Sequence, residues 1–209
     1  MSDALLLVDI QHDFMPGGAL AVPQGDEVVP VANRLQPCFD LVVATQDWHP
    51  PGHGSFASQH PGRKPFDVIE LNGLEQILWP DHCVQGTRGA ELVPELDQSR
   101  IARVFRKGTD PGIDSYSGFF DNGHKQATGL GDYLRDRGVN TVYLVGLAED
   151  VCVMYTALDA RRLGFQVRVV REGTRPVNAQ PGDAARAEQR MTEAGVAFVS
   201  AESIVAERA

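Results

Sequence analysis

Three residues of this sequence together have the chemistry of a nucleophilic catalyst, namely Cys152, Asp9 and Lys107. A thiol attacks a carbonyl carbon once it loses its proton, so it needs a base and benefits from a nearby positive charge. Asp9 could accept that proton, because burial in a cavity raises the pKa of a carboxylate. Lys107 would place an ammonium beside both groups. These residue types predict covalent attack on a carbonyl compound.

The position of Cys152 distinguishes it from the other two cysteines. It falls in the first turn of a helix predicted over 150–163, where free backbone N–H groups and the helix dipole favour a thiolate. Backbone N–H groups at the same place can also hold a negatively charged oxygen. Cys38 and Cys83 have no such setting, and a lone cysteine is most often a small buried apolar residue. We therefore take Cys152 as the candidate nucleophile.

A second group of side chains has the composition of a metal site. Asp47 and His49 lie two positions apart beyond a predicted strand, so their side chains point to the same side, and His82 follows in the segment Trp-Pro-Asp-His-Cys-Val. One carboxylate and two imidazoles leave coordination positions open, which is typical of a catalytic or substrate-binding ion. We expect one divalent metal ion here; zinc suits this ligand set best, and iron and manganese also fit. His53 is either a fourth ligand or a group that supports the ligands.

Short apolar segments rich in Val and Leu alternate with segments of helical periodicity. Strands are predicted over 4–8, 41–45, 101–105, 141–145, 166–170 and 196–199, and helices over 26–35, 126–137, 150–163 and 183–195. This alternation predicts an α/β fold with a parallel sheet and right-handed crossovers. Because we find no repeat, linker or low-complexity tract, we expect residues 1–209 to form a single domain.

The candidate residues follow the predicted strands one after another. Asp9 comes after the first strand, Asp47 and His49 after the second, Lys107 after the third and Cys152 after the fourth. In an open parallel sheet, ligands bind outside the carboxyl ends of the strands. We therefore expect these side chains to meet at one edge of the sheet.

Residues 46–99 do not follow the pattern of strands and helices. The segment is rich in Pro, Gly and His, and it shows little periodicity beyond 73–78. It holds both tryptophans and four of the 6 histidines. A loop of this length within a compact domain is usually functional, so we interpret it as the metal-binding region.

The composition argues against several classes of protein. With 19 Lys and Arg against 28 Asp and Glu, the formal net charge of -9 argues against a general affinity for nucleic acid or anionic membranes. Three cysteines are too few for a disulfide framework. Residues 1–9 lack the basic region of a signal peptide, and no apolar run approaches the about 20 residues of a membrane span. We expect a cytoplasmic protein, and the sequence is compatible with a homo-oligomer.

A dinucleotide cofactor does not fit the sequence. Its binding site needs Gly-x-Gly-x-x-Gly directly after the first strand, whereas residues 9–14 read Asp-Ile-Gln-His-Asp-Phe. Gly17 and Gly18 come too late, and Gly129 and Gly131 lie within a helical pattern. We therefore expect no Rossmann-type cofactor.

Five blocks, in the same order and along nearly the whole chain, resemble the motifs of the nicotinamidases (pyrazinamidases), a family of isochorismatase-like hydrolases. They are 8–14 (VDIQHDF) with 17–20 (GGAL), 44–50 (ATQDWHP) with 53–56 (HGSF), 79–87 (WPDHCVQGT), 107–108 with 116–119, and 145–153 (VGLAEDVCV). The Asp and Lys blocks alone indicate only the superfamily, and the metal-ligand block beside the cysteine block is specific to nicotinamidases. True isochorismatases resemble this pattern but lack the cysteine nucleophile.

The resemblance implies a single three-layer α/β domain, in which helices cover both faces of a six-stranded parallel sheet with a Rossmann-like strand order. It implies that nicotinamide and water react to nicotinate and ammonia through a thioester, and that pyrazinamide is also a substrate. Asp9, Lys107 and Cys152 would form the catalytic triad, and the divalent ion would receive the pyridine nitrogen. A cis peptide bond before Ala148 is also implied. We expect the backbone N–H groups of Ala148 and Cys152 to hold the oxyanion.

Four further residues are candidates for lining a flat aromatic cavity: Phe14, Leu20, Trp79 and Tyr116. Two other functions stay open at this point. A cysteine amidohydrolase of the N-carbamoylsarcosine or ureidoacrylate amidase type would share the triad but need no metal that binds a pyridine. A non-catalytic metal-binding module would release no ammonia and would not need Cys152.

Overall fold

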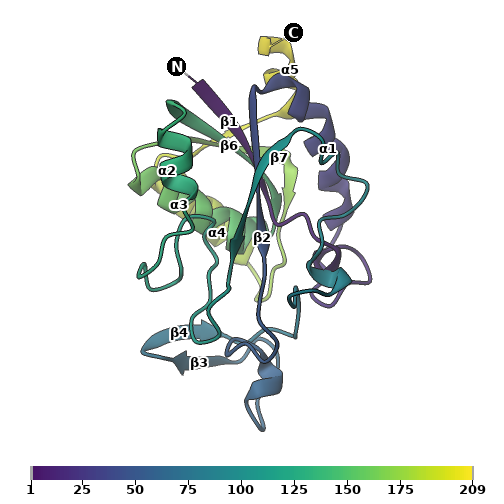
Figure 1. The fold of residues 1–209 in the computed structure, drawn as a ribbon, viewed down its shortest axis with the longest axis vertical. Helices are drawn as coiled ribbons and strands as arrows, with labels where there is room; N and C mark the ends of the chain where they lie inside the picture. Colours follow the sequence, from purple (N-terminus) through teal and green to yellow (C-terminus); the bar gives the residue numbers. More distant parts are fainter. Residues whose placement is uncertain (1, 209) are drawn as a thin grey trace.

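The computed structural model describes residues 2–208, and a parallel sheet of six strands forms its centre (Figure 1). The strand order is β5-β2-β1-β6-β7-β8, and neighbouring strands are parallel throughout. The strands are β1 Ser2–Val8, β2 Leu41–Asp47, β5 Ile101–Lys107, β6 Val139–Leu147, β7 Gln166–Arg175 and β8 Ala197–Val199. The predicted α/β fold and its six strands are confirmed.

Within residues 2–208, five α-helices accompany the sheet: α1 Val28–Leu35, α2 Leu130–Arg135, α3 Met154–Arg162, α4 Asp183–Glu193 and α5 Ala201–Arg208. None of the helices in this part of the chain is both long and apolar enough to cross a membrane. The sequence pattern does not predict α5, because only Ala201 and Ile204 of this short helix are buried. α2 is shorter than predicted, because Gly129 adopts a φ of 89° just before it.

The sheet is buried on both faces because successive residues of a strand point to opposite sides. In β1, Leu5 and Leu7 belong to a core cluster with buried residues of α1 and α5. Leu6 and Val8 belong to a second cluster with residues of α2, α3 and α4. The two groups of helices accordingly lie on opposite sides of the sheet in Figure 1.

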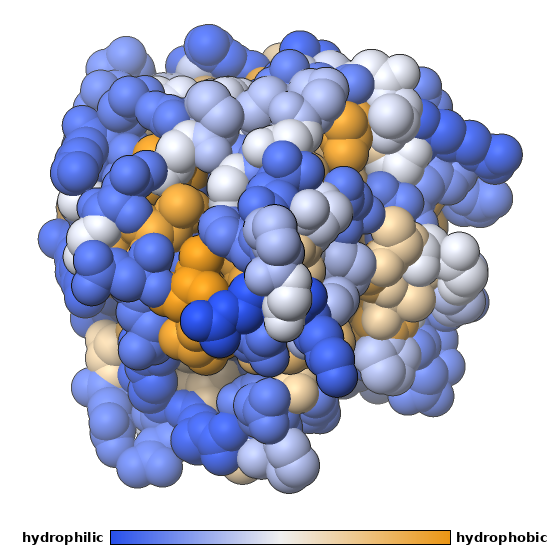
Figure 2. Space-filling model, turned by 90° about the horizontal axis from the view of Figure 1, so that it is seen from below, coloured by the Kyte–Doolittle hydropathy of each residue, from blue (hydrophilic) through white to orange (hydrophobic). Residues whose placement is uncertain are grey.

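A two-stranded antiparallel hairpin lies apart from the main sheet, within the segment 46–99. It consists of β3 Val68–Leu71 and β4 Leu74–Ile77 and lies beyond the carboxyl ends of the sheet strands (Figure 1). Asn72 and Gly73 form its turn with φ of 52° and 84°, as in a tight two-residue hairpin turn. The expected strands omit this pair because its residues are mostly half-buried or exposed, although Asn-Gly is a hairpin signal. Seen from the end of the molecule that carries this hairpin, the surface is mostly hydrophilic with a few apolar groups (Figure 2).

The strand order reverses between β1 and β6, at the centre of the sheet. β1 connects through α1 to β2 on one side, and β6 connects through α3 to β7 on the other. Such a reversal opens a crevice at the carboxyl ends of the two strands, which is the usual place for a ligand. Asp9 follows β1 and Cys152 follows β6, so the fold places both residues at this crevice.

Candidate active site

Lys107 lies at the centre of the three residues that the sequence predicts to be catalytic. Its Nζ is 2.8 Å from Asp9 Oδ2 and 3.4 Å from Cys152 Sγ, and it also forms an ion pair with Asp47. A carboxylate oxygen of Asp9 lies within 4.8 Å of the Cys152 sulfur. All four side chains are buried. The fold therefore brings the predicted base, ammonium and thiol into contact.

Asp9 and Lys107 are held in place by neighbouring strands. Asp9 directly follows β1 and has a φ of 50°, in the left-handed region that few non-glycine residues adopt. Thr45 of β2 donates a hydrogen bond of 2.7 Å to Asp9 Oδ1, and the other carboxylate oxygen faces Lys107. Lys107, the last residue of β5, also donates to the Ser115 carbonyl at 3.0 Å. These contacts fix the carboxylate and the ammonium relative to each other.

Cys152 lies in a single π-helical turn, Glu149–Val153, which precedes α3. The carbonyl of Ala148 accepts hydrogen bonds from two N–H groups of this turn, at 3.1 and 3.0 Å. The prediction of an ordinary α-helical first turn is wrong in this detail, and π-turns are frequent at functional sites. The peptide bond Leu147–Ala148 is cis, as the resemblance implies.

Burial and charge determine the protonation of the catalytic groups. Burial raises the pKa of the Cys152 thiol well above its ordinary value, and the opposing effect of Lys107 is smaller. Burial also raises the pKa of Asp9, again against the effect of Lys107. Burial therefore favours the neutral thiol of Cys152, whereas the start of the helix and Lys107 favour the thiolate. An attack by Cys152 would need a proton acceptor, and a carboxylate oxygen of Asp9 within 4.8 Å of the sulfur is the candidate.

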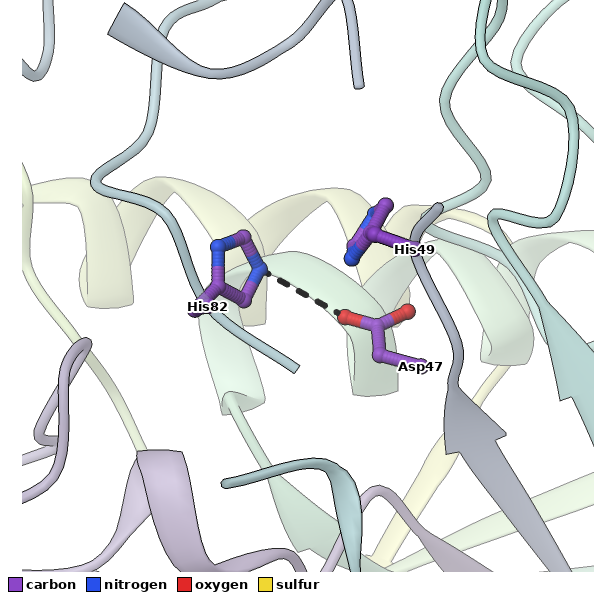
Figure 3. Close-up of side chains that lie close together, drawn as sticks. All are labelled: Asp47, His49 and His82. Atoms are coloured by element: carbon purple, nitrogen blue, oxygen red, sulfur yellow. Dashed lines mark ion pairs between the residues drawn. The ribbon is translucent and has the colours of Figure 1, made fainter. Parts of the chain in front are cut away.

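The three predicted metal ligands converge beside these groups (Figure 3). One ligand atom from each of Asp47, His49 and His82 lies within 4.8 Å of the others, and His82 Nε2 is 3.7 Å from Asp47 Oδ2. Burial would raise the pKa of Asp47, but Lys107 and His49 outweigh this effect and hold the pKa below its ordinary value. The group therefore offers an ionised carboxylate and two imidazoles that face one another.

The hydrogen bonds of the two histidines leave one nitrogen of each ring for a cation. His49 Nε2 is 3.0 Å from Asp114 Oδ1, and its Nδ1 is buried with no hydrogen-bond partner in the described part of the chain. His82 Nδ1 is 2.8 Å from the Pro80 carbonyl, and its Nε2 faces Asp47. Histidines that bind metals usually have such an acceptor on the second ring nitrogen. The donor set and the unpartnered nitrogen both fit a divalent ion.

His53 packs behind this group and does not belong to it. Its Nδ1 is 2.8 Å from Ser55 Oγ and its Nε2 is 2.8 Å from the Asp110 carbonyl, so each ring nitrogen already has a hydrogen-bond partner within the protein. The His53 ring meets the His49 ring edge to face, with centroids 4.6 Å apart. Of the two roles that the sequence leaves open, the geometry favours support of His49.

A small cavity borders both groups. Its polar lining comes from Asp47, His82, Asp114 and Cys152. The rest of the lining is apolar or aromatic and includes the four residues expected there, Phe14, Leu20, Trp79 and Tyr116. The other four are Val22, Ala148, Val151 and Val177. A mainly apolar cavity with a few convergent polar groups suits a small ring compound that carries a carbonyl group.

Three residues that shape the site have no strong signal in the sequence: Gln11, Thr45 and Asp114. Gln11 donates to the carbonyl of Asp47 and accepts from its N–H, both at 2.8 Å, so it fixes the backbone of this ligand. Asp114 is 65 positions from His49 in the sequence and contacts it in the fold. For Gln11 and Thr45, the one signal is that they lie close to candidate residues within the resembling blocks. Asp114 lies in the gap between the two parts of the block 107–108 with 116–119.

Comparison with known proteins agrees with this geometry. The family model described as the isochorismatase domain matches residues 3–203. The nicotinamidase of Escherichia coli (strain K12) is 55% identical over 196 residues, which cover 92% of this chain and 92% of that protein. The similarity therefore extends over both groups of candidate residues.

Two solved structures share the fold over nearly the whole chain. The Acinetobacter baumanii nicotinamidase/pyrazinamidase has a TM-score of 0.95 at 45% identity and covers 97% of this chain and 98% of its own. The pyrazinamidase of Pyrococcus horikoshii, solved in complex with zinc, has a TM-score of 0.77 at 38% identity and covers 96% of this chain and 99% of its own. By sequence, fold and the arrangement of its candidate site, this chain belongs to the isochorismatase family.

Proposed function

We propose that this protein is a nicotinamidase, which hydrolyses nicotinamide to nicotinate and ammonia and also accepts pyrazinamide. The observation that carries the proposal is the Cys152 thiol, in contact with Lys107, in the same aromatic cavity as Asp47 and His82. The similarity to nicotinamidases over nearly the whole chain supports the same substrate. Asp9, Lys107 and Cys152 are the proposed catalytic residues.

In the first half of the reaction, the thiol attacks the carboxamide carbon. Cys152 Sγ bonds to that carbon while its proton passes to Asp9, and the carbonyl oxygen becomes negatively charged. The backbone N–H groups of Ala148 and Cys152 hold this oxygen, and one such donor typically contributes about 3 kcal/mol. Lys107 compensates the charge that develops on sulfur. Asp9 then gives the proton to the amide nitrogen, the C–N bond breaks, and ammonia leaves.

In the second half, water replaces the thiol. A thioester now links Cys152 to the nicotinoyl group, and Asp9 is again a carboxylate. Asp9 accepts a proton from water while the water oxygen bonds to the thioester carbon. The C–S bond breaks, Asp9 returns its proton to the sulfur, and the acid product loses its own proton to solvent as nicotinate.

The metal-ligand group positions the substrate ring in this proposal. Asp47, His49 and His82 would hold a divalent ion, which when bound supplies a Lewis acid for the pyridine nitrogen. We propose zinc, because one carboxylate and two imidazoles with open positions are typical of a zinc site that binds substrate. The zinc complex of the related pyrazinamidase supports this choice. The aromatic lining residues Phe14, Trp79 and Tyr116, with Leu20, would enclose the flat ring and exclude water.

Ammonia release from nicotinamide tests the proposal. The purified protein is assayed directly, after treatment with a chelator, and after zinc, iron or manganese is returned. We expect equal amounts of ammonia and nicotinate, loss of activity with the chelator, and the best recovery with zinc. Ammonia release that does not depend on metal would favour a cysteine amidohydrolase without a pyridine-binding metal. Absence of ammonia release from any carboxamide would contradict the proposal and favour a non-catalytic metal-binding module.

We also propose that the enzyme works in the cytoplasm. All three cysteines are free, and a nucleophilic thiol needs a compartment that keeps it reduced. Fractionation of cells that express the protein at its natural level tests this, with activity expected in the cytoplasmic fraction.

A further inference from the structure

Most residues of the β3–β4 hairpin are exposed or half-buried, but Gln76 of β4 is buried. Its exposed fraction is 3%, whereas its neighbour Glu75 is exposed. Burial of an amide is unfavourable unless its polar atoms find partners. The contacts of Gln76 therefore indicate what the hairpin contributes to the interior of the protein.

The Gln76 amide nitrogen lies among three hydrogen-bond acceptors. It is 2.7 Å from the Ile77 carbonyl, 2.8 Å from the Tyr116 hydroxyl oxygen and 3.3 Å from Asp114 Oδ2. A carbonyl and an ionised carboxylate accept hydrogen bonds and donate none, so the amide nitrogen must face them and the amide oxygen cannot. The surroundings of Gln76 thus fix the orientation of its amide.

These contacts join two parts of the cavity wall. The other carboxylate oxygen of Asp114 is 3.0 Å from His49 Nε2, on the ring whose Nδ1 is left for the metal. The Tyr116 oxygen also accepts a hydrogen bond of 3.2 Å from Trp79 Nε1. Asp114, Tyr116 and Trp79 all line the cavity. From behind this lining, Gln76 contacts both the acidic partner of a metal ligand and the aromatic wall.

We propose that Gln76 is a positioning residue through which the hairpin sets the affinity of the site for both metal and substrate. Its amide holds Asp114 against His49 and holds Tyr116 against the substrate ring. Without this amide, Asp114 Oδ2 loses its donor and the carboxylate is held only through Oδ1, by His49 and the Ser115 N–H, so its position against His49 is less fixed. Tyr116 then keeps the contact with Trp79 alone. The substrate part of this proposal rests on the proposed nicotinamidase function, and the metal part does not.

Gln76→Met tests the proposal, because it keeps the length of the side chain and removes its hydrogen bonds. Zinc affinity is measured on metal-free protein by competition with a coloured chelator, without substrate. We expect zinc binding to weaken by about tenfold, as for other groups behind metal ligands. We also expect the KM for nicotinamide to rise by about fivefold, as for the loss of one hydrogen bond, with kcat little changed. Glu75→Gln, at the exposed neighbouring position, is the matched control and should change neither value.

Asp114→Asn shows whether Gln76 acts through Asp114. In that background, Gln76→Met should weaken zinc binding by no more than about twofold, because the connection to His49 is already altered. Unchanged zinc affinity in Gln76→Met alone, or the full tenfold effect in the Asp114→Asn background, would overturn the proposal. Lower thermal stability with unchanged zinc affinity and KM would overturn it too. If Gln76→Met does not fold, Gln76→Asn shortens the reach of the amide and carries the same expectations.

The two proposals can fail separately. The unmodified protein is assayed for ammonia release from nicotinamide in parallel, and absence of ammonia would refute the proposed function. The zinc measurement does not depend on that result, because it is made without substrate. A protein that deamidates nicotinamide and binds zinc equally well with Gln76 or Met at this position would refute the positioning role alone.

Discussion

Asp9 and Lys107 come from the carboxyl ends of sheet strands, whereas His49 and His82 come from the irregular segment that follows β2. β1 and β5 both pair with β2, so a continuous hydrogen-bonded ladder determines how far apart Asp9 and Lys107 lie. The two histidines have an isolated bridge between His49 and Val84 in place of such a ladder. Asp9 and Lys107 are therefore positioned by different means from the two histidines of the metal-ligand group.

Side chains that bond to the backbone hold the irregular segment in place. Gln11 binds the backbone of Asp47, Gln85 Nε2 donates to the Trp48 carbonyl at 2.9 Å, and Asp13 accepts from the Cys83 N–H at 2.7 Å. Each such hydrogen bond typically contributes about 1 kcal/mol to stability. The positions of His49 and His82 (the metal side) depend on separate contacts of this size. The positions of Asp9 and Lys107 (the catalytic side) depend on interactions between buried charges. Changes on the metal side should therefore alter binding, and changes on the catalytic side should alter turnover.

The largest expected effect is that of Cys152→Ala. Because the thiol is the proposed nucleophile and is not a metal ligand, kcat should fall by about 10⁴-fold or more while metal content stays the same. Initial rates of ammonia release and elemental analysis of the protein measure the two quantities. Cys38→Ala, outside the site, should keep full activity. A residual rate within tenfold of the unmodified enzyme would contradict covalent catalysis.

Lys107→Met should damage both turnover and stability. The substitution leaves the buried carboxylates of Asp9 and Asp47 without their shared ammonium, which should lower the free energy of unfolding by about 3–5 kcal/mol. The rate should fall by at least about 100-fold, because the charge on sulfur loses its compensation. Denaturant unfolding and ammonia release are the measurements. Arg103→Met, an exposed position on β5, should cost less than about 1 kcal/mol, and equal losses in the two variants would contradict the role of Lys107.

His49→Ala should act on the metal side. The protein should fold and lose its divalent ion on dialysis, and the KM for nicotinamide should rise by about 10- to 100-fold. Elemental analysis and steady-state kinetics check these outcomes, with the exposed His124→Ala as the control. Full metal content in His49→Ala would show that this ligand is assigned wrongly.

Thr45→Val should have the smallest effect, and it tests most directly whether the catalytic residues and the metal ligands can be altered separately. It removes the 2.7 Å hydrogen bond to Asp9 Oδ1 and nearly keeps the shape of the side chain. The loss of about 1 kcal/mol should lower kcat by about fivefold and leave KM and metal content unchanged. Thr141→Val, at the other end of the sheet on β6, is the matched control. A change in KM alone would mean that the two sides of the site are not separable in this way.

The predictable part of the fold is the part with strong periodicity. Six buried strands and four helices follow from runs of Val and Leu and from amphipathic spacing, which a sheet buried on both faces requires. The β3–β4 hairpin buries too little to produce such a pattern, and the π-turn at Cys152 depends on how the chain leaves β6. Beyond the Asn-Gly turn of the hairpin, local sequence carries little information on either feature.

The residues of the candidate site also form two groups, those that the sequence predicts and those that it does not. Asp9, Asp47, Lys107 and Cys152 can be found because each follows a predicted strand, and parallel strands bring their carboxyl ends together. Asp114 and Gln76 cannot be found, since their roles arise from contacts with residues far away in the chain. The protonation of Cys152 also depends on burial, which the position of a residue in a helix does not reveal.

The class of fold, the edge of the sheet where the candidate residues lie and the types of group that meet there follow from the sequence alone, because hydrophobic periodicity and the order of the predicted segments are local properties of the chain. Only the tertiary structure reveals which nitrogen of each histidine is left for a metal, that His53 packs against His49, and that burial favours the neutral thiol of Cys152. These properties depend on distances and on exclusion of water, and both exist only once distant segments have packed together.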